Sequence, residues 1–306
     1  MAADNYVRSY GDVSRKEDVV LNAVEILTAK ETQIFNMLGK TEAIDTVHSY
    51  LTDTLKAAGS NAAVEGDDYS YGARTTPSRL TNLIQHIQVP FAVSDTQRQI
   101  QHYHGRDELE RQTEKALLEW ANDAEFNLLR STLVSGASGT APAMAGIIQA
   151  ISVAGNNTAH TSGTAWAASI LDGLVKLNYE QSNGDLATDL FMGSYLRSLT
   201  DGFTQKSNVV VQGPATTIIR TVGFYQTAFG TIALHTHRYI QQAGDATGRV
   251  LGLAPSKLRV AFLQRPMVDN DIARSGPAKK RAVTGSMTVE VRNQKSNFFA
   301  SGFNIG

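Results

Sequence analysis

Two pairs of histidines have the spacing that comes nearest to a chemical site in this sequence. His102 and His104 are two residues apart, as are His235 and His237. On a strand, both side chains of a pair would project from the same face, and two imidazoles on one face can begin a zinc site. A catalytic zinc needs a third protein ligand, and none recurs at motif spacing nearby. The aromatic and cationic residues beside the pairs favour packed or interfacial surfaces, so we predict no metal site.

No catalytic motif is complete. Residues 39–41 (Gly-Lys-Thr) match the end of a phosphate-binding loop, but Ile34 stands where its first glycine is needed, so we predict a helix stop instead. Residues 136–139 are glycine-rich but lack the lysine, which indicates a loop. Asp123 and Glu125 are two apart and would face different ways on a helix. The chain has no cysteine, which excludes disulfides and thiol catalysis. We predict no enzyme and no cofactor.

The one cluster of charge lies near the C-terminus. It contains Arg274, Lys279, Lys280, Arg281, Arg292 and Lys295, with Asp271 and Glu290 among them. Such a segment can contact phosphates non-specifically, although a solvated loop beside a strand is the simpler interpretation. The formal net charge of −1 argues against a surface built wholly for nucleic acid.

The elements that must position these residues are mixed helices and strands. Residues 1–12 predict an extended arm, residues 14–17 and 28–31 are capping boxes that predict helix starts, and Gly39 predicts a helix stop. The start of the chain lacks the apolar run of a signal peptide, and no segment approaches the roughly 18 apolar residues of a membrane span.

An extended excursion and a long helix dominate the first half. Residues 44–55 and 80–93 are β-prone and flank a small-residue stretch at 57–68, which predicts a two-stranded excursion with a mobile tip. Residues 106–134 predict a helix of roughly 40 Å, more than twice the usual length of about 11–12 residues. The arm and the excursion are hard to bury in a compact monomer. The residues alone therefore predict an assembly subunit.

The second half alternates between the two structure types. A Gly-, Ala- and Ser-rich stretch at 135–162 predicts a boundary. Helices are expected at 166–177 and 195–203, a short buried run at 190–192, strands within 216–239 and at 257–263, and paired closing strands from 287 to 305. The fold class is α+β.

Short motifs in a fixed order make the sequence resemble a family of tailed-phage major head proteins over nearly the whole chain. They are Asp12-Val13-Ser14-Arg15-Lys16-Glu17-Asp18, Glu31-Thr32, Leu38-Gly39, Asp53-Thr54-Leu55, Glu65-Gly66, Arg79, Asn82, Val93-Ser94-Asp95-Thr96, Phe229-Gly230-Thr231-Ile232, Arg238, Gly285, Glu290-Val291 and Asn293. One departure affects local packing: the family has a bulky aromatic, typically tryptophan, shortly before residues 53–55, where this chain has His48 or Tyr50.

The resemblance implies the Hong Kong 97-type capsid fold. Its parts would be an N-terminal arm at 1–35, the E-loop hairpin with a flanking P-domain strand at 36–105, the spine helix with P-domain at 106–149, an A-domain at 150–265 and returning P-domain strands at 266–306. The implied function is that of a major capsid protein, which self-assembles into hexamers and pentamers of an icosahedral head around double-stranded DNA. The expected location is the virion, assembled in the host cytoplasm.

The resemblance also implies partners and residues. Expected partners are further copies of the chain, a portal protein, possible decoration and scaffolding proteins and packaged DNA, with no membrane; since no segment precedes Met1, we expect the scaffold to be separate. Candidates for self-assembly are Arg15, Asp53, Glu65, Arg79 and Arg238, and candidates for a DNA-facing surface are Lys279, Lys280 and Arg281. The alternatives are an encapsulin-type compartment shell and a soluble α+β enzyme with an unrecognised site.

Overall fold

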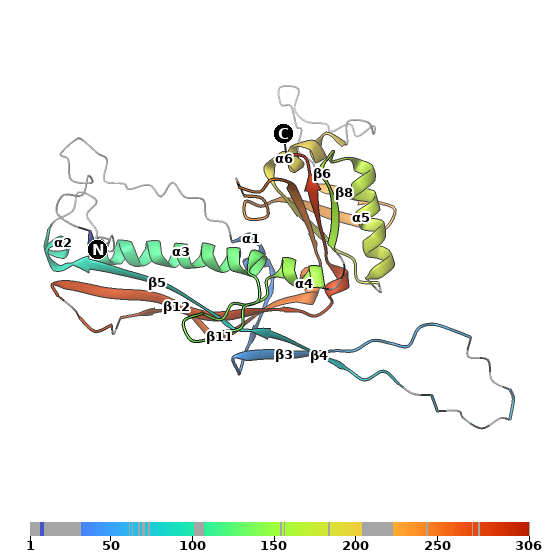
Figure 1. The fold of residues 1–306 in the computed structure, drawn as a ribbon, viewed down its shortest axis with the longest axis horizontal. Helices are drawn as coiled ribbons and strands as arrows, with labels where there is room; N and C mark the ends of the chain where they lie inside the picture. The colour runs from blue at the N-terminus through green and yellow to red at the C-terminus, as the bar shows by residue number, and fades with distance from the viewer. Residues whose placement is uncertain are drawn as a thin grey trace.

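The computed structural model describes residues 7–8, 32–60, 62, 64–66, 68, 71–72, 74–100, 107–153, 155, 157–182, 184–203, 223–242, 244–270, 272–274 and 276–305. These residues form two sheets, a separate hairpin and the helices packed on them (Figure 1). Most of the expected arm, both capping boxes, the His102–His104 pair and residues 204–222 lie outside the described residues.

The first sheet has five strands in the order β1 (Val7–Arg8), β5 (Gln85–Ser94), β12 (Ala278–Val291), β11 (Leu258–Asp269) and β2 (Gly39–Glu42). The three central strands pair antiparallel, and the two edge strands pair in parallel. Side chains alternate between faces along a strand, so Val283, Met287 and Val289 of β12 share one face and lie in the hydrophobic core.

The helix α3 (Glu108–Arg130) lies along that face of the sheet (Figure 1). It begins at Asp107, whose carboxylate accepts from the Leu109 amide at 3.1 Å, and it buries Trp120 and Leu128. Its 23 residues span about 34 Å. The helix predicted at 106–134 is confirmed but ends earlier, because the chain turns at Ser131, whose carbonyl accepts from the Gly146 amide at 2.8 Å. The short helices α1 (Gln33–Met37), α2 (Asp95–Gln99) and α4 (Ile147–Val153) pack nearby.

The second sheet has six strands and its own core. The order is β6 (Asn157–Thr164), β13 (Phe298–Phe303), β10 (Gly248–Leu253), β7 (Asp189–Met192), β9 (Gly230–Thr236) and β8 (Phe224–Thr227). The helices α5 (Ala168–Gln181) and α6 (Ser194–Asp201) confirm the two helices predicted there. Leu171, Leu196 and Phe303 are fully buried in this second core.

One sequence prediction needs correction. The strand predicted at 80–93 is two strands, β4 (Ser78–Leu83) and β5, because Ile84 donates its amide to Thr46 and the chain passes there from the hairpin into the first sheet. The stretch at 135–162, which the sequence predicts as a boundary, contains the short helix α4 and the polar edge strand β6. The helix stop predicted at Gly39 is confirmed, since β2 begins there. No helix among the described residues has both the length and the apolar character needed to cross a membrane.

Gly285 of β12 provides a test of how closely α3 packs on the sheet. A Cβ atom at this position would lie 2.6 Å from Trp120 Cζ2 and 3.2 Å from Pro266 Cα. We expect Gly285→Ala to lower the free energy of unfolding by about 1–3 kcal/mol, because the added methyl group overpacks the core. Urea denaturation of the purified protein measures this change.

Gly173, in the middle of α5, is the matched control. Its added Cβ meets nothing within 4 Å. Gly173→Ala should raise the free energy of unfolding by about 0.5–1 kcal/mol, because alanine is the better helix former. Equal effects of the two substitutions would contradict the packing argument.

Candidate functional site

A two-stranded hairpin, fixed at its base, projects from the molecule beside the first sheet. β3 (Val47–Thr52) pairs antiparallel with β4, and the described residues of 53–77 continue beyond the paired part (Figure 1). At the base, His48 Nε2 lies 2.7 Å from Glu290 Oε1, and the Tyr50 hydroxyl accepts from the Val291 amide at 3.2 Å. Burial raises the pKa of Tyr50, and the Glu290 charge adds to this shift. His48 and Tyr50 thus fill the region where the family has tryptophan, and they tie the hairpin to β12.

Asn82 of β4 makes the second attachment. Its amide nitrogen donates to the carbonyls of Ala145 and Val289, at 3.0 Å each. Its amide oxygen accepts from the Ala145 amide at 2.9 Å and from Leu83 at 2.9 Å. Both the donors and the acceptor of the buried Asn82 amide group are therefore fully hydrogen-bonded. These bonds fix the direction in which the hairpin leaves the sheet.

The part of the hairpin beyond this base carries large apolar side chains in solvent. Leu55 is 98% exposed and Tyr71 is 93% exposed, and Leu51 and Val64 are also exposed. A group of exposed apolar side chains on one projection is typical of an interaction surface. The hairpin is therefore our first candidate assembly surface.

A buried carboxylate joins three separate parts of the chain. Glu125 of α3 is fully buried, and its two oxygens accept from the amides of Ile34 at 2.8 Å and Phe35 at 2.6 Å, at the start of α1. Its Oε1 also lies 2.8 Å from Nε2 of His237, which follows β9 of the second sheet. His237 Nδ1 accepts from the Tyr239 amide at 3.3 Å, so the proton of a neutral ring is on Nε2, which donates to Glu125.

His235, the other histidine of the 235–237 pair, makes a similar connection. His235 Nε2 lies 2.8 Å from Asp189 Oδ1, and its Nδ1 lies 3.0 Å from Gln33 Nε2 of α1. The two rings both contact Phe191, as expected for side chains on one face of a strand. Within the described part of the chain, no group of three or more potential ligands is placed to hold a metal ion. The pair has a structural role in joining α1 to the second sheet.

An ion pair at the end of α3 makes a further connection to the second sheet. The Arg130 guanidinium donates to both oxygens of Asp245, at 3.0 and 2.8 Å, in the segment that leads into β10. Burial alone would raise the pKa of Asp245, but hydrogen bonds from Arg130 and the Gln242 amide, together with the Arg249 and Arg130 charges, lower it below its ordinary value.

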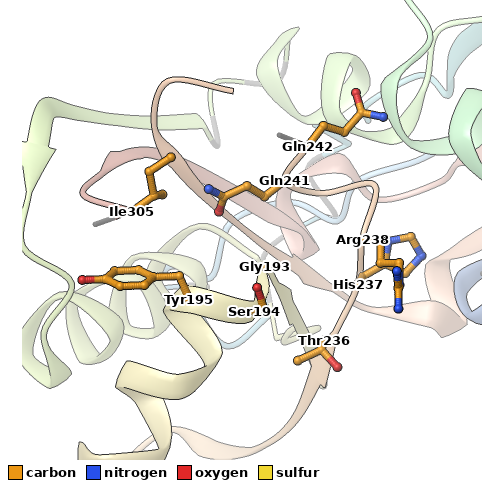
Figure 2. A pocket seen from close by; sticks show the side chains of 9 residues that line it. All are labelled: Gly193, Ser194, Tyr195, Thr236, His237, Arg238, Gln241, Gln242 and Ile305. Atoms are coloured by element: carbon orange, nitrogen blue, oxygen red, sulfur yellow. The ribbon is translucent and has the colours of Figure 1, made fainter. Parts of the chain in front are cut away.

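A cavity of about 880 Å³ lies beside these connections of α3 to the second sheet. It is enclosed by the start of α6, the segment after β9 and the C-terminal residues. Figure 2 shows Tyr195, Gln241 and Ile305 around one part of it and Arg238 at another. A Cβ atom at Gly193 would lie 2.7 Å from Gln241 Oε1, so a glycine is needed where Gln241 closes over the chain. Arg238, a predicted assembly residue, is exposed at this rim.

The structure spreads the predicted assembly residues over distant surfaces. Asp53, Glu65 and Arg79 are exposed on the hairpin, where Arg79 donates to the Ser49 hydroxyl at 3.0 Å. Arg15 lies outside the described residues. Sequence motifs drew attention to these positions but not to Glu125, whose role depends on partners about a hundred residues away in the chain.

Of the three predicted DNA-facing residues, Arg281 has surroundings that differ from those of Lys279 and Lys280. They are consecutive on β12, so their side chains alternate between its faces. Arg281 is partly buried against α3 and donates to the Thr113 hydroxyl at 3.2 Å. Lys279 and Lys280 line a smaller cavity at the end of the sheet.

Replacing the Glu125 carboxylate tests its role in connecting α3 to α1 and to the second sheet. We expect Glu125→Gln to lower the free energy of unfolding by about 1–3 kcal/mol or more, because the amide offers one acceptor oxygen for three buried donors. Hydrogen exchange at the Ile34 and Phe35 amides should accelerate, and urea denaturation measures the stability.

Glu119→Gln is the control, since Glu119 is half exposed on the same helix and its carboxylate lies 3.4 Å from the Lys115 ammonium group. A change of at most about 0.5 kcal/mol is expected for it. Unchanged exchange at Ile34 in Glu125→Gln would contradict the proposed role of the carboxylate.

The Arg130–Asp245 pair predicts a pH dependence. A carboxyl whose pKa is lower in the folded chain stabilises fully above its unfolded pKa of about 4 and loses that contribution as the pH falls through the folded pKa. Asp245→Asn should therefore destabilise the protein at neutral pH, and the difference from the unsubstituted protein should shrink in acid. Thermal unfolding at pH values from about 7 to about 3 measures this, and a difference independent of pH would refute it.

Comparison with known proteins assigns the chain. It matches the family model of the SU10 major capsid protein over residues 7–304. Its fold is similar to the capsid of Myoviridae phage XM1, with a TM-score of 0.65 at 12% identity over 95% of this chain and 99% of that chain. The capsid of a native GTA particle gives 0.64 at 12% over 92% and 93%, and Mycobacterium phage Che8 gives 0.60 at 11% over 95% and 98%. No curated protein sequence matches.

The solved structures and the family match support two different conclusions. At such low identity the solved structures establish the fold, and they confirm the α+β, Hong Kong 97-type architecture predicted from the ordered motifs. The family match covers most of the chain and sets aside the enzyme and compartment-shell alternatives. The chain belongs to the SU10 major capsid protein family: it is a major capsid protein of tailed-phage-like particles, a component of the virion shell and not an enzyme.

Proposed function

We propose that copies of this chain assemble into hexamers and pentamers of an icosahedral head that encloses double-stranded DNA. The observation that carries this proposal is the hairpin, whose base is fixed by His48, Tyr50 and Asn82 while its outer part leaves Leu55 and Tyr71 in solvent. A second copy beneath the hairpin would bury these side chains, and each copy would contact several others. Weak contacts repeated around a closed shell then act together.

The proposal assigns a part to each segment. Residues 1–35 are the arm, 36–105 the E-loop hairpin with its flanking strand, 106–149 the spine helix with the P-domain, 150–265 the A-domain and 266–306 the returning strands. Asp53, Glu65 and Arg79 would act on the hairpin, Arg238 at the cavity rim, and Arg15 in the arm. A portal protein and possible decoration and scaffolding proteins complete the expected partners.

Hairpin variants test the assembly. Leu55→Asp combined with Tyr71→Asp should reduce the yield of closed shells by about tenfold or more, because a buried unpaired charge costs several kcal/mol at each of many repeated contacts. Electron microscopy and sedimentation of the expressed protein measure the yield, and particles from virus-producing cells should contain nuclease-resistant double-stranded DNA.

Val153→Asp, at an exposed apolar side chain on α4, is the control for added surface charge. Shells should form with this variant. Normal shells from the hairpin variant would refute the assembly role of the hairpin, and a monomeric wild-type protein under all conditions would refute the proposed function.

A further inference from the structure

We draw no further inference here: the strongest candidate, the largely apolar cavity of about 560 Å³ beside the hairpin base, lined by Leu83, Ile84 and Leu263 among others, carries nothing because nothing in the described part of the structure shows what covers it.

Discussion

The Glu125 carboxylate is the interaction on which the arrangement of the described parts depends. It lies on the long helix, accepts from two amides of α1 and receives a hydrogen bond from His237 beside the second sheet. A buried carboxylate is unfavourable unless all its partners are in place, and the same holds for the three donors. Loss of any one member therefore weakens the other contacts. A second connection of this kind lies two residues earlier in the chain, where His235 contacts both Gln33 of α1 and Asp189 of β7.

These polar contacts add a fixed orientation to a chain that has two apolar cores. The first core packs α3 on the first sheet and also includes Phe191, Leu251 and Phe299 of the second sheet, while the second core packs α5 and α6 on that second sheet. Polar contacts at Glu125 and at Arg130–Asp245 connect the helix to the second sheet in fixed directions. Hydrogen bonds and ion pairs are directional, whereas apolar burial is not. Directional contacts between α3 and the second sheet would fix the angle between the two sheets. A shell subunit needs a fixed angle if its neighbours are to be placed correctly.

The sequence predicted the elements that are defined locally and missed those defined by distant partners. The α3 helix follows from its apolar stripe, and the stop before Gly39 follows from the glycine. The break at Ile84 has no local signal, because β-prone residues continue on both sides and only pairing separates the two sheets. Polar β6 lacks an apolar alternation, so its pairing with β13 was not predicted. Glu125 likewise has no local signal, since its partners are brought to it only by the fold.

The hairpin combines a rigid base with an extended outer part, and that division suits the proposed shell. A head-to-tail contact closes into a ring only at one angle per step, so one chain that forms both hexamers and pentamers needs a contact that accepts two angles. His48, Tyr50 and Asn82 hold the base in one direction. Beyond β3 and β4, the described residues of 53–77 form no strand or helix, so an altered angle there would break no backbone ladder. A contact made by this outer part therefore tolerates the change in curvature that a packed contact at the base would resist.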